Sequence, residues 1–295
     1  MIQPNLIAVN TQIDTLPPLP AIITKVMAVT ANPESNANDL MEVILPDQSI
    51  CSTILKVANS AFFGIPREVS SIERAVVVLG FEEIRNIVIG KAIFSAFPKM
   101  SKEQRLTVGL FWEHALTCGI AAKIIGSTFR MSASELFIAG LIHDIGKLAL
   151  LLTFPNDYLL LREISSPGRL DSTSEEVSDY SISHDQVGLK LAKQWLLPEK
   201  LTMAIGYHHS PEKATSDVQY PLVIQVADIL SLMYSSSDIL IGEDVIKIFD
   251  DFLPDTKTLW SANGMELQPE NLSRWFNELE KSREENQGIL NILAS

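Results

Sequence analysis

Apolar residues recur at intervals of three and four along most of the chain, and this helical spacing is the feature that most constrains the fold. The segment from 21 to 30 is a clear example. Its isoleucine, valine and methionine side chains follow an i, i+3, i+4 pattern after the entry Pro17–Pro20. We find no convincing alternation of apolar and polar residues, which would indicate β-strands, and no internal repeat. The pattern therefore predicts an all-α fold.

Proline and glycine divide this pattern into segments. Asn32-Pro33, Pro46, Gly64–Pro66 and Gly80 separate the helices of the first hundred residues, and Pro98 ends that region. We predict helices over 21–30, 38–45, 48–58, 71–79, 82–97, 104–129, 134–152, 156–164, 174–195, 199–207, 220–233, 243–252 and 270–293.

The short linker Pro98–Ser101 predicts two helical subdomains with a boundary near residue 100. The predicted organisation is an N-terminal helical subdomain over 1–100, a second helical subdomain over 101–240 and a C-terminal helical extension over 241–295. The tail from Gln268 to Ser295 is amphipathic. We expect it to pack on the core of its own chain, and the alternative is a second copy in a homodimer.

Composition narrows the classes of partner. Hydrophobic residues make up 46% of the 295 residues, which is enough for a substantial core, and the formal net charge is −13. Such a charge repels a polyanion, so we expect no DNA binding. The N-terminus lacks the basic and apolar regions of a signal peptide, and no apolar run approaches the roughly 20 residues that cross a bilayer. The expected location is the cytoplasm, without membrane association.

The candidate functional residues are five histidines and two aspartates, all in the second region. Imidazole and carboxylate are ligands that borderline divalent metals prefer, and an isolated buried one is costly to desolvate. Each alone has an ordinary explanation, since a single histidine on an amphipathic helix is usually a hydrogen-bonded core or surface residue. A shared metal is one explanation that serves for all of them. The candidate ligands are His114, His143, Asp144, His184, His208, His209 and Asp228.

The segment His143–Lys147 resembles the signature of the HD superfamily of metal-dependent phosphohydrolases. The order of the candidate ligands resembles that of HD-GYP phosphodiesterases, which hydrolyse cyclic dinucleotides. The resemblance implies that Asp144 bridges two metals and that Lys147 faces the substrate phosphate, so these two are the candidate catalytic residues. Lys147 could otherwise be an exposed helix lysine. The resemblance further implies one metal held by His114, His143 and Asp228, and a second held by His184, His208 and His209.

A second resemblance, to HDOD domains, covers roughly residues 15 to 230. HDOD domains are bacterial regulatory modules related to the HD superfamily, and many lack several of the metal ligands, whereas every candidate position is filled here. One minor departure is Asp47-Gln48, where the family usually has Asp-Pro. The residues that carry the resemblance are Leu16–Pro20, Pro46–Ser49, Val57–Gly64, Ser71-Ile72 and Ala75–Gly80.

These patterns lead to two main functional hypotheses. The first is a bacterial signal-transduction protein whose HDOD domain binds a divalent metal, with signalling proteins or a nucleotide as partners. The alternative is an active metal-dependent phosphohydrolase acting on a nucleotide or cyclic dinucleotide. Ser210–Lys213 replaces the Gly-Tyr-Pro motif after His208-His209, which argues against specific cyclic dinucleotide hydrolysis. The expected cofactor is a dinuclear centre of divalent transition metal ions, with iron or manganese favoured over zinc or nickel. An iron-based redox sensor is a third possibility.

Overall fold

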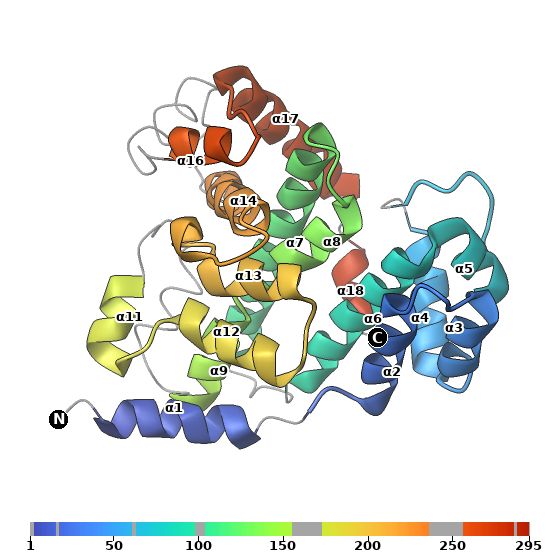
Figure 1. The fold of residues 1–295 in the computed structure, drawn as a ribbon, viewed down its shortest axis with the longest axis horizontal. Helices are drawn as coiled ribbons and strands as arrows, with labels where there is room; N and C mark the ends of the chain where they lie inside the picture. Colours follow the sequence, from blue (N-terminus) through green and yellow to red (C-terminus); the bar gives the residue numbers. More distant parts are fainter. Residues whose placement is uncertain are drawn as a thin grey trace. The chain divides into compact units, whose positions relative to one another are not determined.

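A computed structural model describes residues 3–15, 18–60, 63–97, 104–154, 173–235, 256–285 and 288–294. Within these ranges the chain forms helices, turns and loops without a β-strand, which confirms the all-α prediction (Figure 1). The helices predicted over 156–164 and 243–252 lie outside the described residues, as does the linker 98–101.

The chain divides into two compact units, and each combines two separated stretches of sequence. One unit contains residues 1–16 and 99–281, and the other contains residues 17–98 and 282–295. The division at 98 and 99 lies beside the predicted boundary near 100. Residues 1–16 group with the unit that carries the histidines, and the last residues of the chain group with the other unit.

The unit without the histidines is built from short helices with well-defined starts. Asn36 and Asp39 form a capping box at the start of α3, and the Asp47 carboxylate accepts a hydrogen bond from the Ile50 backbone nitrogen at 3.0 Å at the start of α4. The helices are α2 (Ala21–Ala31), α3 (Ala37–Ile44), α4 (Gln48–Ala58), α5 (Ile72–Leu79), α6 (Phe81–Ala96) and α18 (Ile289–Ala294).

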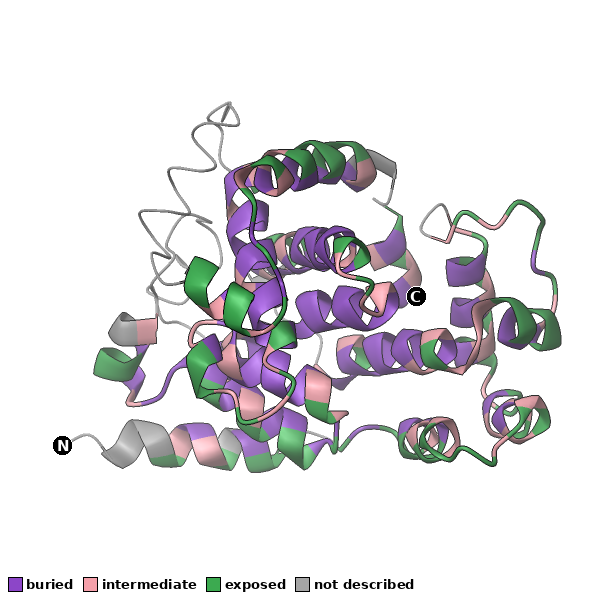
Figure 2. Cartoon of the chain, turned by 45° about the horizontal axis from the view of Figure 1, so that its top comes forward, coloured by how far each residue is buried: buried purple, intermediate pink, exposed green. Residues whose placement is uncertain are grey.

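The histidine-bearing unit carries every candidate ligand, and its core consists of almost fully buried helices (Figure 2). Tight crossings join them. A Cβ atom added to Gly140 would lie 2.7 Å from the Gly119 Cα, so α7 and α8 meet backbone to backbone. The elements are α1 (Gln3–Thr15), α7 (Gln104–Thr128), α8 (Ala133–Ile142), α9 (Ile145–Thr153), α11 (Thr173–Tyr180), α12 (His184–Gln194), α13 (Glu199–Tyr207), η1 (Pro211–Lys213), α14 (Gln219–Ser235), α16 (Thr256–Ala262) and α17 (Pro269–Glu285).

Two predicted helices are each two helices in the structure, and both breaks lie at the site. The predicted helix 134–152 ends at Ile142 and restarts at Ile145, because Asp144 leaves the helical region with φ −96° and ψ 12°. The predicted helix 174–195 is interrupted where Ser181 adopts a left-handed φ of 65°. The first break gives α8 and α9, and the second gives α11 and α12.

The C-terminal tail also divides, into α17 and α18. The apolar face of α17 is buried in the histidine-bearing unit, where the Trp275 indole nitrogen donates to the Thr128 hydroxyl at 2.9 Å. In the other unit Ile289 and Leu293 are buried, and the Lys91 ammonium donates to the Leu293 carbonyl at 3.1 Å. Most of the described apolar side chains of the tail are thus buried against the chain itself, whereas Leu290 and Ile292 are half-buried. Helices α1 and α16 were not predicted.

Two apolar stretches reach the length and composition that can span a bilayer, so the expectation that no run approaches that length is wrong. They are Thr107–Thr128 and Ala133–Thr153. However, 67% and 83% of their most apolar windows are buried inside the protein. Core helices pass the same test, because they are also apolar on every face.

Candidate metal centre

All the candidate ligands lie in one cluster, where several elements of the histidine-bearing unit meet. His114 lies within α7 and Asp228 within α14, whereas His143 and Asp144 occupy the turn between α8 and α9. His184 is the first residue of α12, and His208-His209 follows the end of α13. Helix ends therefore supply five of the seven side chains.

The first group of ligand atoms comes from His114, His143 and Asp228, with Asp144 beside them. The Asp228 Oδ1 atom lies 3.1 Å from the His114 Nε2 and 3.6 Å from the His143 Nε2. The Asp144 Oδ2 atom lies 3.7 Å and 3.4 Å from the same two nitrogens. Two imidazole nitrogens and two carboxylate oxygens thus converge on one point.

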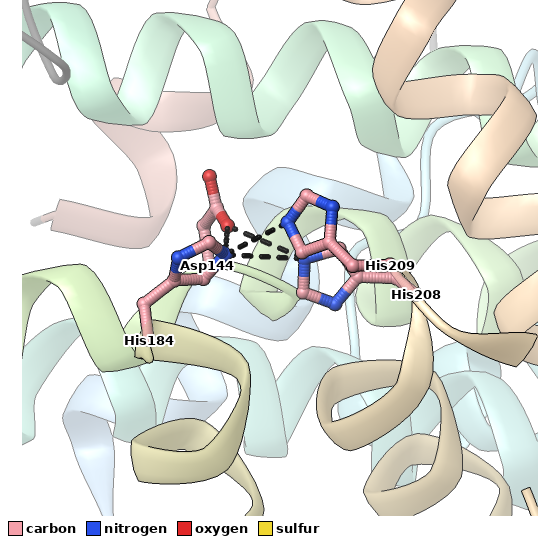
Figure 3. A group of neighbouring side chains, drawn as sticks. All are labelled: Asp144, His184, His208 and His209. Atoms are coloured by element: carbon pink, nitrogen blue, oxygen red, sulfur yellow. Dashed lines mark hydrogen bonds and ion pairs between the residues drawn. The ribbon is translucent and has the colours of Figure 1, made fainter. Parts of the chain in front are cut away.

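The second group comes from His184, His208 and His209, and it meets the other oxygen of Asp144 (Figure 3). The Asp144 Oδ1 atom lies 3.1 Å from the His184 Nε2 and 3.6 Å from the His208 Nε2. The His184 Nε2 is also 3.4 Å from the His208 Nε2 and 3.0 Å from the His209 Nε2. Asp144 therefore faces the two groups with different oxygens.

The Asp144 side chain is free for this position because it does not cap its own helix. Asp144 is the N-cap residue of α9, yet its side chain makes no capping hydrogen bond. Aspartate at this position usually caps, as Asp47 does for α4. The carboxylate instead lies among the histidines and the ammonium group of Lys147, whose Nζ is 2.7 Å from its Oδ2.

The histidine rings are oriented by hydrogen bonds on their far side. The His143 Nδ1 lies 2.7 Å from the Gly140 carbonyl oxygen, and the His208 Nδ1 lies 2.9 Å from the Ile205 carbonyl oxygen. A carbonyl oxygen accepts but cannot donate, so each Nδ1 carries the proton. In the neutral ring, each Nε2 then has a lone pair directed at the cluster.

His114 and His184 have side-chain partners in the same role. The Ser231 hydroxyl lies 3.1 Å from the His114 Nδ1 and itself donates to the Asp228 carbonyl at 2.8 Å, so its oxygen accepts from His114. The His184 Nδ1 lies 2.8 Å from the Glu176 Oε2. Four rings are thus held with Nε2 facing inward, an arrangement typical of metal-binding histidines.

Burial and charge act against each other in the cluster. Burial alone would raise the pKa of Asp144 and Asp228, but neighbouring histidines hold both values well below the usual range, and Lys147 adds to this at Asp144. Burial lowers the pKa of His208. At His184 burial also acts to lower the pKa, yet Glu176 and Asp144 outweigh it and raise the value to about 10.

Several buried polar atoms of the cluster lack a hydrogen-bond partner. Their chemistry shows whether a metal ion fits the site. These are the His143 Nε2, the Asp144 Oδ1 and the Asp228 Oδ1. Leaving such atoms buried and unpaired is costly, and all three belong to the converging groups. Nitrogen and oxygen donors of this kind suit a borderline divalent metal, so the residues fit one.

The cluster is partly exposed to solvent. The side chains of His114, Asp228 and Lys147 are 13%, 12% and 16% exposed, whereas those of His143 and His184 are fully buried. Lys147 is therefore not an exposed helix lysine, since it is mostly buried and paired with Asp144. Solvent therefore reaches Lys147, part of the first group and, in the second group, the half-buried His209.

Two orienting residues were missed by the sequence reasoning, namely Glu176 and Ser231. Glu176 lies in a polar segment, eight residues before the histidine that it contacts, and a continuous helix would keep the two apart. Ser231 follows Asp228 by three residues and is an ordinary residue for a helix. Its only signal in the sequence is this i, i+3 spacing from a candidate ligand.

Comparison with known proteins identifies the family. The sequence profile of the HDOD domain matches residues 16–211, more than half of the chain. The chain belongs to the HDOD family. A protein from Treponema pallidum is 25% identical to this HDOD chain over 224 residues, which cover 75% of the chain and 42% of that protein. The chain thus spans less than half the length of that relative.

Solved structures agree with the fold of this HDOD protein. A predicted phosphohydrolase from Shewanella amazonensis is 22% identical, with a TM-score of 0.74, and the match covers 97% of this chain and 98% of that one. A predicted signal transduction protein from Marinobacter aquaeolei is 20% identical, with a TM-score of 0.72, and the match covers 99% of this chain and 66% of that one. At these identities the likeness establishes the fold alone.

Proposed function

We propose that this HDOD protein is a cytoplasmic signal-transduction protein that binds two divalent transition metal ions, iron or manganese, at the cluster around Asp144. The observation that carries the proposal is the convergence of the histidine Nε2 atoms on the two oxygens of one buried carboxylate. In the four rings with an Nδ1 hydrogen bond, the Nε2 atom faces the cluster. Polar residues that only fill the core, without binding a metal, would not need this common orientation. The similarity to a predicted signal transduction protein supports the regulatory role.

The charge of the site indicates the kind of ligand that would be sensed. Asp144, Asp228 and Glu176 are three carboxylates, and the ammonium group of Lys147 is paired with Asp144. Two divalent cations would outweigh the remaining negative charge and leave the centre positive. An anionic group, such as the phosphate of a nucleotide, is therefore the ligand that we propose, with another signalling protein as the partner that reads the state.

Elemental analysis of untagged protein purified without oxygen tests metal binding. We expect about two equivalents of a transition metal in the wild type. In His143→Ala the first group loses one of its two imidazoles, so we expect it to lose its metal ion while the second group retains its own. Circular dichroism confirms that the variant is folded. A folded wild-type protein without metal would refute the proposal.

A second candidate function, hydrolysis of a phosphate ester, is favoured by one specific observation. Two groups of ligands share the Asp144 carboxylate, and Lys147, whose side chain is 16% exposed, lies beside it. When two metals are bound in this way, they supply an activated water and a clamp for a phosphoryl group. The similarity to a predicted phosphohydrolase agrees with this function.

Substitution of Lys147 separates the two functions. Lys147 contacts Asp144 but belongs to neither group of ligands. If the protein is a hydrolase, we expect Lys147→Met to keep its metal and to lose about 100-fold in turnover of a generic phosphodiester, because a preorganised charge beside the transferred group is removed. Absence of turnover in metal-loaded wild type would instead favour the signalling role.

A further inference from the structure

Glu176 on α11 has an unusual position for a glutamate. It is 0% exposed, and its Oε2 atom accepts two hydrogen bonds from the same residue. The His184 backbone nitrogen donates at 2.7 Å, and the His184 Nδ1 lies at 2.8 Å. The other oxygen, Oε1, is buried without a hydrogen-bond partner. A carboxylate buried in this way is costly, so its contacts with His184 require an explanation.

Capping of α12 explains only part of this geometry. The N-cap residue of α12, Ser183, makes no capping bond with its side chain, and the Glu176 carboxylate takes that place at the backbone nitrogen of His184. A cap needs no contact with the imidazole. The bond to the His184 Nδ1 fixes the direction of the ring, and the ring presents its Nε2 to Asp144 at 3.1 Å.

The histidines of the second group are supported in different ways. The His208 ring is held by the carbonyl oxygen of Ile205, three residues earlier, so it is oriented whenever α13 is folded. The His184 ring is held by a side chain from α11, which precedes it across the left-handed turn at Ser181. The orientation of His184 therefore depends on where another helix lies.

Helix α11 places two of its described side chains in the protein interior. Among its described side chains, Glu176 and Tyr180 are buried, whereas residues 177–179 are exposed. Tyr180 stacks on Phe154, just after α9, with ring centroids 5.0 Å apart. A movement of α11 would carry the Glu176 carboxylate with it and so change its contact with the His184 ring.

We propose that Glu176 is a positioning residue for the second metal group, and that α11 thereby sets the metal affinity of that group independently of the first. This inference rests on the proposed metal-binding function. Carboxylate partners of ligating histidines tune metal affinity by about 10–100-fold. Glu176 contacts His184 of the second group, whereas His143 and His114 of the first group are oriented by Gly140 and Ser231, so the affinity of the first group is expected to stay unchanged.

Titration of the metal-free full-length protein with Co²⁺ alone tests the proposal, because its absorption bands report each site. We expect Glu176→Ala to weaken one of the two binding events by about 10–100-fold and to alter its absorption band. In Glu176→Gln the amide oxygen still accepts from the Nδ1–H, so we expect partial rescue. The matched control is Glu135→Gln, another buried glutamate, which contacts Lys200 and Tyr220 instead of a histidine.

The possible outcomes are distinguishable. Selective weakening of one event, partly restored in Glu176→Gln and absent in Glu135→Gln, supports the proposal. Equal weakening of both events would show a purely structural role, and unchanged binding in Glu176→Ala would show no role; either overturns the inference while metal binding stands. A wild type that binds no Co²⁺ overturns both this inference and the proposed metal function.

Discussion

Asp144→Asn is expected to lose both metal ions at once, the largest effect of any single substitution in the cluster. Asp144 faces the first group with Oδ2 and the second group with Oδ1. An amide nitrogen has no lone pair for a metal, and the remaining oxygen is uncharged. Because both groups share this carboxylate, the loss should exceed that in His143→Ala, where one group stays complete. Metal content and Co²⁺ titration measure the difference.

The matched control for this substitution is Asp185→Asn. Asp185 is also buried and follows His184 directly, but its carboxylate accepts from the Ser183 hydroxyl and from the Gln186 backbone nitrogen at 2.9 Å. We expect this variant to keep both metal ions. If Asp144→Asn retained about two equivalents with wild-type affinity, Asp144 would not be the bridging ligand.

The helices that the sequence predicted accurately are those bounded by residues with strong local preferences. The predicted segments 48–58 and 199–207 coincide with α4 and α13. Asp47 precedes α4 and caps it with its side chain, and Pro198 precedes α13, where proline cannot continue a preceding helix. In such segments local chemistry and tertiary packing agree, so the amino-acid pattern is sufficient.

The breaks at the site could not be predicted in the same way. The run around His143-Asp144 is apolar on both sides and contains no proline, so its spacing is that of one continuous helix. The turn places His143 and Asp144 in the cluster, which is a property of the tertiary structure. The positive φ of Ser181 is likewise not encoded by a glycine. The bond between Glu176 and His184 depends on that turn and was missed with it.

The candidate ligands themselves could be identified because charged and imidazole groups stand out in apolar helices. Asp228 is an example, since apolar residues surround it in α14. The structure brings all seven together in the two groups that the HD-type resemblance implies. The residues that orient them could not be identified, because a backbone carbonyl or a serine carries no distinctive signal in a sequence.

Gly146→Ala is expected to destabilise the protein strongly. An added Cβ atom would lie 1.9 Å from the His184 carbonyl oxygen and 2.8 Å from the Gly188 nitrogen, both of which are backbone atoms. Neither can move without shifting α12. We expect a loss of about 3 kcal/mol in the free energy of unfolding, the upper part of the range for overpacking, measured by denaturant titration of the metal-free protein.

Gly109→Ala is the matched control, because Gly109 also lies in a helix but a Cβ atom there meets nothing within 4 Å. There we expect stabilisation by about 0.5–1 kcal/mol, since alanine restricts the unfolded chain and favours the helix. If Gly146→Ala were as stable as the wild type, the close crossing of α9 and α12 would be refuted.

Gly146→Ala should also affect the two metal groups unequally. Moving α12 away from α9 carries His184 away from Asp144, whereas His114, His143 and Asp228 lie on α7, the end of α8 and α14. We therefore expect folded Gly146→Ala protein to lose the second Co²⁺ ion and to keep the first. This gives a physical reason for the glycine within the segment His143–Lys147. It allows the start of α12 to approach closely enough for His184 to reach the shared carboxylate.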